Sequence, residues 1–301
     1  MTQTDPVKAP FHSGFISIVG RPNVGKSTLL NALVGEKVAI VSPKPQTTRN
    51  RIIGILNVPD AQLVFVDTPG IHKPRTKLGE FMDQSIQEAT KGIDGLLVVL
   101  DAARITDADQ RVVQDMRGMK VPKILVLNKI DLVHPQDLLK PMADFSQAGY
   151  DAILPVSAKT GDGVDILKQE LLQRLPEGPA YFPVSMWTDQ TERQFVAELI
   201  REQALFALQE EIPHGIGVEV LTMKDMSEEM VEIYANIFCE RESHKRIIIG
   251  RQGAMLGVIG RKAREGMEKL LGKKVNLQLW VKVRPDWRNS AGDLKTLGYT
   301  E

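Results

Sequence analysis

The feature that most constrains this chain is a run near its N-terminus that matches G-x-x-x-x-G-K-[ST], namely Gly20-Arg-Pro-Asn-Val-Gly-Lys-Ser27. An apolar stretch, residues 15–19, precedes the run, and a segment with a helical pattern, residues 28–34, follows it. In this order the glycines let consecutive backbone N–H groups turn toward one anion, and the helix N-terminus adds its positive dipole. The run therefore predicts a phosphate-binding loop rather than a chance glycine turn.

The residue types in this loop suit a nucleotide triphosphate. Lys26 supplies a point charge between the β- and γ-phosphates, and the Ser27 hydroxyl suits a Mg²⁺ ligand. The expected phosphate-binding residues are Gly20, Arg21, Pro22, Asn23, Val24, Gly25, Lys26, Ser27 and Thr28.

The surrounding sequence alternates short apolar runs with amphipathic stretches of helical length. Runs of nearly continuous apolar residues are typical of strands that are buried on both faces of a parallel sheet. We expect a doubly wound α/β domain with a mostly parallel six-stranded sheet. The runs are residues 15–19, 62–66, 95–100, 123–127 and 152–156, and the clearest helical stretches are 106–116 and 164–175.

A second motif indicates which base is bound. Asn128-Lys-Ile-Asp131 follows the apolar run 123–127. A carboxylate accepts two hydrogen bonds, and guanine presents two adjacent donors where adenine presents an acceptor. Asp131 is therefore expected to select guanine, while Asn128 bonds the ring edge and ties loops together. A backbone N–H of residues 157–159 is expected on the guanine oxygen, so the guanine-binding residues are Asn128, Lys129, Asp131, Ser157, Ala158 and Lys159.

Two segments are expected to sense the γ-phosphate. In the first segment, residues 46–50, a threonine completes the Mg²⁺ coordination shell; we favour Thr48, with Thr47 as the alternative. In the second, Asp67 holds Mg²⁺ through water and the Gly70 N–H bonds the γ-phosphate. Hydrolysis would release both segments, which makes them a switch. Switch I is Gln46, Thr47, Thr48, Arg49 and Asn50, and switch II is Asp67, Thr68, Pro69, Gly70 and Ile71.

The pattern changes after a proline-rich stretch that we interpret as a linker. Beyond it, the order helix–strand–strand–helix–helix–strand predicts a small α+β domain. The expected divisions are a flexible N-terminus, 1–13, a nucleotide domain, 14–176, a linker, 177–188, a second domain, 189–286, and a tail of no assigned role, 287–301.

The charges of the second domain fall into two opposed blocks. The whole chain has 38 basic and 38 acidic residues. Residues 189–240 contain 3 basic and 12 acidic residues (net −9), whereas residues 241–288 contain 13 basic and 4 acidic residues (net +9). A clustered basic block favours a phosphate backbone as ligand.

The basic block contains a Gly-x-x-Gly loop, Gly250 to Gly253, between two short helical patterns. Glycines there let a nucleic-acid backbone approach without obstruction by Cβ atoms, and a helix–helix turn is the alternative reading. The loop and its apolar and basic neighbours resemble a KH RNA-binding domain, and this resemblance implies that the ligand is unpaired RNA rather than a duplex, and not DNA. The expected RNA-binding residues are Lys245, Arg246, Gly250, Arg251, Gln252, Gly253, Arg261 and Lys262.

These motifs, in this order and spacing, resemble the Era family of bacterial P-loop GTPases, and the basic block resembles a type II KH domain. The resemblance covers essentially the whole chain. It implies a GTP-controlled factor that binds 16S ribosomal RNA near its 3′ end during maturation of the small (30S) subunit, with Mg²⁺ as cofactor. It also implies loose association with the inner membrane, and the single cysteine, Cys239, fits the reducing environment of the cytoplasm.

The resemblance further implies slow hydrolysis. Ile71 occupies the position where signalling GTPases carry the glutamine that orients water. Related GTPases with this substitution use K⁺ held by the loop asparagine, here Asn23, whereas simple loop capping is an equally weighted reading of that residue. A second functional hypothesis is an RNA-binding chaperone with a vestigial nucleotide domain. A third, a tRNA-modifying GTPase, would need extra cofactor-binding segments, and no residues remain for them.

Overall fold

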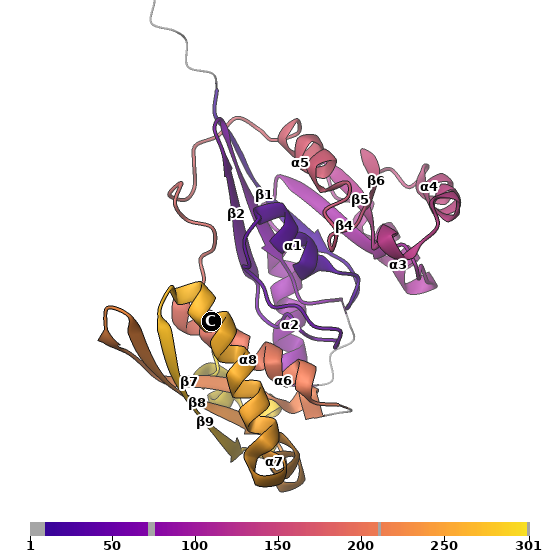
Figure 1. Cartoon of the computed structure of the whole chain (residues 1–301). Helices are drawn as coiled ribbons and strands as arrows, with labels where there is room; N and C mark the ends of the chain where they lie inside the picture. Colours follow the sequence, from indigo (N-terminus) through magenta and orange to yellow (C-terminus); the bar gives the residue numbers. More distant parts are fainter. Residues whose placement is uncertain (1–9, 72–75, 210–211, 300–301) are drawn as a thin grey trace, which may run out of the picture. The chain divides into compact units, whose positions relative to one another are not determined.

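The computed structural model describes residues 10–71, 76–209 and 212–299, and these residues form two compact units (Figure 1). Each unit contains one sheet. Among the described residues, unit 1 contains 10–39, 51–71 and 86–189, and unit 2 contains 40–50, 76–85 and 190–299.

Unit 1 is built on a six-stranded sheet of order β2-β3-β1-β4-β5-β6. Its neighbouring strands run parallel except for the pair β2 and β3. The expected doubly wound, mostly parallel sheet is thus confirmed. The strands are β1 (His12–Val19), β2 (Ile52–Val58), β3 (Ala61–Asp67), β4 (Gly95–Asp101), β5 (Lys123–Asn128) and β6 (Ala152–Val156).

Helices cover both faces of this sheet, which explains its apolar strands. Leu29 of α1 and Leu167 of α5 belong to one buried cluster with sheet side chains. Val112 of α3 and Phe145 of α4 belong to a second cluster on other sheet residues. The helices are α1 (Lys26–Val34), α3 (Asp107–Met116), α4 (Leu139–Phe145) and α5 (Val164–Leu172). The helix α2 (Lys77–Ala89) is divided between the units, because residues up to Ser85 group with unit 2.

The apolar runs account for five of the six expected strands, and the sixth is β2. It forms an antiparallel pair with β3, in which Ile52 lies opposite Asp67 and Val58 opposite Ala61. Gly54 in its middle is required by packing, since a Cβ atom there would lie 2.6 Å from Leu30 Cδ1 of α1. This interior glycine interrupts the apolar pattern that identifies the other strands.

The proline-rich linker runs along the sheet of unit 1. Ser13 Oγ donates to the Pro179 carbonyl over 2.6 Å, and the Ile55 N–H donates to the Trp187 carbonyl over 3.0 Å. The buried Gln62 side chain accepts the N–H of Tyr181 over 2.7 Å. Of the expected N-terminal segment, residues 1–9 lie outside the described residues, and the last two residues belong to β1.

Unit 2 contains a three-stranded sheet in which β8 pairs antiparallel with β7 and parallel with β9. In Figure 1, α6 and α8 lie side by side on one face of this sheet. The expected order of elements is confirmed, and Ile233, Ile259 and Met267 are fully buried in the core. The elements are α6 (Glu192–Ala207), β7 (Gly217–Ser227), β8 (Met230–Cys239), α7 (Glu242–Ile249), α8 (Ala254–Leu271) and β9 (Lys274–Val283).

The C-terminal tail, residues 287–299, contributes to a buried apolar cluster of unit 2. It forms a 3-10 turn, η5 (Trp287–Asn289), and a short helix, α9 (Ala291–Thr296). Trp287, Leu294 and Tyr299 are buried together with Leu78 and Met82 of α2. Among the described residues, no helix is both long enough and apolar enough to cross a membrane.

Candidate functional site

The phosphate-binding loop has the backbone that its glycines predict. Gly25 has φ +97°, and a Cβ atom there would lie 2.3 Å from Asn128 Nδ2. Lys26 Nζ is buried and donates to the carbonyls of Gly20 and Arg21, each over 3.1 Å. Burial lowers the pKa of the Lys26 ammonium, and the nearby Asp67 carboxylate opposes that shift. The loop therefore holds a desolvated cation at the start of α1, where an anion binds most favourably.

The side chain of Arg21 contacts the start of α3. Its Nη1 donates to Thr106 Oγ1 over 2.6 Å and to Asp109 Oδ2 over 3.0 Å, at the start of α3. Asp109 also accepts the N–H of Thr106, which completes a capping box. The Arg21 side chain thus anchors the loop to α3, and only its backbone is available to a phosphate.

Ser27, in the first turn of α1, contacts Asp67, the last residue of β3. Ser27 Oγ donates to Asp67 Oδ2 over 2.7 Å, and the Asp67 side chain is fully buried. A hydroxyl and a carboxylate are the hard oxygen ligands that Mg²⁺ prefers. The pair therefore fits the expected metal.

The segment after β3 lies directly on the phosphate-binding loop. The Ile71 N–H donates to the Gly20 carbonyl over 3.2 Å, and a Cβ atom at Gly70 would lie 2.7 Å from Pro22 N. Ile71 packs against the apolar cluster around Val98 and Leu100. Its side chain presents no polar group that could orient a water molecule.

Asn128 joins three loops. Its Nδ2 donates to the Val24 carbonyl over 2.8 Å, and its Oδ1 accepts the Ala158 N–H over 3.0 Å. The expected loop-tying role is thus visible in the geometry. The backbone N–H groups of Ser157 and Ala158 donate to the Asp162 carbonyl and to Asn128 respectively, and the backbone N–H expected on the guanine oxygen stays a prediction.

The other guanine residues form a second set of contacts. Ser157 Oγ donates to Asp131 Oδ1 over 2.7 Å, which fixes the carboxylate expected to select the base. Lys129 has φ +67°, and its Nζ donates to Asp101 Oδ2 and to the Asn23 carbonyl, each over 2.6 Å. The loop asparagine is therefore connected through its backbone to the base-binding motif.

Switch I groups with unit 2. The Thr47 hydroxyl donates to the Lys44 carbonyl over 2.6 Å and lies 2.8 Å from Ser42 Oγ, so it is used within the segment. Thr48 is buried, and its role as the favoured metal ligand stays a prediction. Gln46 has φ +59°, and Asn50 Nδ2 donates to the Gly298 carbonyl over 3.2 Å.

The Gly-x-x-Gly loop joins α7 to α8 as expected. Gly250, Gln252 and Gly253 all have positive φ, of 72°, 51° and 80°. A Cβ atom at Gly250 would lie 2.7 Å from Met255 Cβ, whereas one at Gly253 would meet no atom within 4 Å. Gly253 is thus open to an approaching backbone, and it precedes the first residue of α8.

A groove of about 390 Å³ extends from this loop between α8 and β9. Its lining combines three glycines, three leucines and two arginines. The lining residues are Gly253, Leu256, Gly257, Gly260, Arg261, Arg264, Leu277 and Leu279.

Of the residues expected to bind RNA, Gly253 and Arg261 line this groove, whereas Arg264 and the two leucines of β9 also line it and were not predicted. The alternation of residues along 275–283 was the available signal for the leucines. Lys262 is exposed and is not among the residues that line the groove. Lys245, Arg246, Arg251 and Gln252 lie on α7 and the loop.

Comparison with known proteins decides the family. A model described as a 50S ribosome-binding GTPase matches residues 15–129, and a KH domain model matches residues 211–288. The chain is 49% identical to GTPase Era of Ruminiclostridium cellulolyticum, over 96% of this chain and 98% of that protein. It is 50% identical to GTPase Era of Clostridioides difficile, over 97% and 99%. The chain belongs to the Era family of GTPases.

Solved Era structures have the same architecture. One is Era in complex with MgGDPNP and nucleotides 1506–1542 of 16S ribosomal RNA, 40% identical over 97% of this chain and 100% of that one, with a TM-score of 0.92. The other is a variant of Aquifex aeolicus Era bound to GDP·AlF4⁻, 39% identical over the same shares, also with a TM-score of 0.92. The expected family and its two-part Era fold are confirmed.

Proposed function

We propose that this protein is a GTP-binding, slowly hydrolysing switch that binds 16S ribosomal RNA near its 3′ end and acts in assembly and maturation of the small (30S) ribosomal subunit. The observation that carries the proposal is the solved Era complex with MgGDPNP and 16S RNA, which matches 97% of this chain. The chain has its own phosphate loop, guanine motif and basic groove, so each ligand of that complex has a matching site.

The nucleotide half of the proposal assigns roles to residues in contact with one another. Lys26 and the loop N–H groups bind the phosphates, and Asp131, fixed by Ser157, selects guanine. Ser27 and Asp67, with Thr48, would hold Mg²⁺, which neutralises charge on the β- and γ-phosphates. Gly70, in contact with Pro22, would sense the γ-phosphate.

Slow hydrolysis and a K⁺ requirement belong to the same proposal. Ile71 packs into an apolar cluster and cannot orient the attacking water. Asn23 lies in the loop with a left-handed backbone, φ +65°, and its carbonyl accepts Lys129 Nζ. We expect faster GTP hydrolysis in KCl than in NaCl of equal ionic strength, and no such difference in Asn23→Ala. Equal rates in both salts for the unmodified protein would assign Asn23 to loop capping.

The RNA half rests on the groove beside Gly253. We expect unpaired bases to lie on the leucines of the groove. Arg261, Arg264 and the start of α8 would face the phosphates. Gly253 has a positive φ, and a Cβ atom placed there would meet no atom within 4 Å. The surface at Gly253 therefore leaves room for the RNA strand.

The alternative, an RNA chaperone with a vestigial nucleotide domain, is disfavoured by the intact contacts of Lys26, Ser27 and Asn128. A decayed site has no reason to keep these buried pairs. Turnover by the unmodified protein compared with Lys26→Ala separates the two hypotheses, because a vestigial domain would show the same low rate in both.

We also propose that the protein works in the cytoplasm and associates loosely with the inner membrane. Exposed basic residues of the 241–288 block, such as Arg241 and Arg246, are able to attract anionic lipids. Sedimentation with vesicles containing anionic lipid, compared with neutral vesicles, tests the association, and no difference would remove the membrane from the proposal.

Crosslinking of RNA from growing cells tests the main proposal. Crosslinks in the 3′ region of 16S RNA are expected, and Gly253→Asp should lose them, since the added carboxylate repels the phosphate backbone. The same variant should hydrolyse GTP normally. Crosslinks that are spread over all abundant RNAs and unchanged in Gly253→Asp would contradict the proposal.

A further inference from the structure

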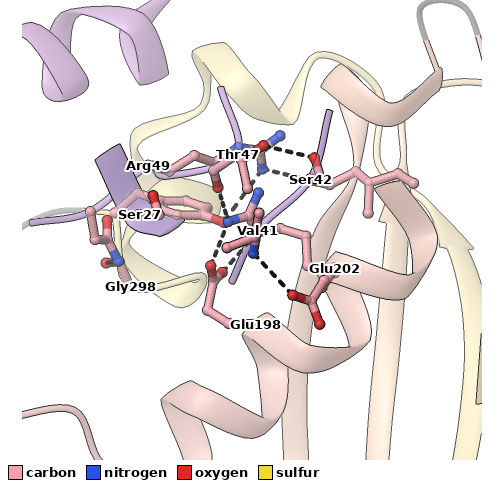
Figure 2. Close-up of polar contacts among 12 residues, drawn as sticks. Ser27, Val41, Ser42, Thr47, Arg49, Glu198, Glu202 and Gly298 are labelled. Atoms are coloured by element: carbon pink, nitrogen blue, oxygen red, sulfur yellow. Dashed lines mark hydrogen bonds and ion pairs between the residues drawn. The ribbon is translucent and has the colours of Figure 1, made fainter. Parts of the chain in front are cut away.

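Two residues of α6 in unit 2 bind the segment 41–50, which contains switch I. Glu202 Oε1 accepts the Val41 N–H over 3.0 Å, and Arg201 donates to the Thr47 carbonyl. Arg201 is itself paired with Glu198. Figure 2 shows Val41 and Thr47 beside Glu198 and Glu202. The segment expected to sense the γ-phosphate is therefore bonded to residues of the RNA-binding unit.

Arg49 makes the most extensive of these contacts. It is 2% exposed, and it donates from Nη1 to the Ile216 carbonyl over 2.6 Å and from Nη2 to the His214 carbonyl over 3.0 Å. Its guanidinium Cζ lies 5.6 Å from the Trp287 ring centroid and 5.8 Å from that of Tyr299. Both distances are within the range of cation–π attraction. We call Trp287, Tyr299 and these two carbonyls the arginine socket.

The socket is a formed part of unit 2. The Trp287 indole is fully buried and donates to the Gly215 carbonyl over 2.9 Å. The rings of Trp287 and Tyr299 are stacked, with centroids 6.1 Å apart. Two rings and two carbonyls, arranged around one planar cation, match the donor geometry of arginine and not that of lysine.

Thr48 and Arg49 cannot move independently. Their Cα atoms are about 3.8 Å apart across a trans peptide, and residues 47–49 are in neither a helix nor a turn. A displacement of Thr48 by several ångströms would therefore move the Arg49 backbone and strain the contacts of its guanidinium with the socket. Conversely, a docked Arg49 restricts where Thr48 is found.

We propose that Arg49 is a positioning residue, and that docking of Arg49 in the arginine socket and binding of the γ-phosphate state by Thr48 stabilise one another. This inference rests on the proposed function. It gives the tail a role: residues 287–299 receive the signal of switch I. Because coupling between two sites is reciprocal, removing the socket contact lowers the preference for triphosphate over diphosphate.

The fluorescence of Trp287 reports on the socket directly. The protein used is the full chain with Trp187→Phe and Trp280→Phe, so that Trp287 is the remaining tryptophan of the three. Acrylamide quenching is measured with Mg²⁺ and either GDP or a non-hydrolysable GTP analogue. We expect a quenching constant about twofold higher with GDP, because the indole loses the cover of Arg49 and gains access to solvent.

Variants separate the socket from general effects of charge. Arg49→Ala should give the same high quenching with both nucleotides, and Arg49→Lys should give most of that change. Arg51→Ala, which removes an exposed arginine two residues away, should keep the difference between nucleotides.

Equal quenching with both nucleotides in the protein with an intact Arg49, both nucleotides being bound, would overturn the inference. It would leave the proposed function standing if GTP binding and RNA binding persist. Lower quenching with GDP than with the analogue would overturn it equally. Failure of the protein to bind GTP at all would instead overturn the proposed function and the inference with it.

Discussion

Asn128 Nδ2 donates a hydrogen bond to the carbonyl of Val24, 104 residues earlier in the chain, over 2.8 Å. The same side chain accepts the Ala158 N–H over 3.0 Å. One buried amide thus fixes the phosphate loop relative to both guanine loops, so the two halves of the nucleotide site are held in place before a ligand arrives.

Asn128→Ala should weaken GTP binding and lower the melting temperature. It leaves a buried carbonyl and a buried N–H without partners, each at a cost of about 1–3 kcal/mol. Calorimetry of GTP binding, with thermal unfolding of the free protein, checks this. Asn57→Ala, at an amide in another part of unit 1, is the control. An unchanged GTP affinity for Asn128→Ala would contradict the role of the amide.

Asp131→Asn should shift base preference from guanine toward xanthine. Ser157 still bonds the new amide oxygen, so the fold is kept, but one acceptor facing the base becomes a donor. Hydrogen bonds to charged groups contribute about 1.5–3 kcal/mol each, so GTP affinity should fall by roughly 100-fold. Competition between GTP and XTP is the measurement. Unchanged guanine selectivity would remove Asp131 from this role.

Arg264→Ala should weaken binding of single-stranded RNA more than Lys262→Ala. Both changes remove one exposed positive charge from α8, but only Arg264 lines the groove. Loss of one phosphate contact should reduce the slope of log K against log salt by about 0.7 for a single strand. Titrations at several salt concentrations compare the two variants. Equal losses would mean that the basic block acts through net charge, not through the groove.

The Cys239 thiol should react slowly with iodoacetamide in the folded protein. Burial raises the pKa of this thiol from 9.0 to about 11, so at neutral pH it is protonated and unreactive. The pKa of the Cys239 thiol is higher in the folded than in the unfolded protein. The stability that comes from this difference is therefore fully present below pH 9 and is lost as the pH rises toward 11. Denaturant midpoints of the unmodified protein and Cys239→Ala across this window give the comparison. Rapid alkylation of the folded chain at neutral pH would contradict the burial.

Short local motifs predicted most of the nucleotide site. The phosphate loop and Asn128-Lys-Ile-Asp131 each fix their own backbone, and parallel strands bring their carboxyl ends to one edge. The contact of Ser27 with Asp67 follows from those two facts. Apolar runs likewise predicted the sheet, except for β2, where Gly54 interrupts the pattern.

The contacts that the sequence did not reveal join distant segments. Arg49 is an ordinary polar residue in its own neighbourhood, and only the fold brings Trp287 and Tyr299 to it. The leucines of β9 belong to the last strand of the expected order, but their place beside α8 depends on how that strand pairs with β8. Side-chain direction also decides that Arg264 lines the groove and Lys262 does not. The spacing of residues along the chain does not show which side chains line the groove, because this depends on how α8 and β9 pack together.

The most direct test of the central claim is a calorimetric titration of the intact protein with single-stranded RNA from the 3′ end of 16S RNA. The titration is made once with GDP and once with a non-hydrolysable GTP analogue, each with Mg²⁺. A switch predicts binding about tenfold tighter or more with the analogue, equivalent to a coupling free energy of about 1.4 kcal/mol. Equal affinity in the two nucleotide states at every salt concentration would contradict the account.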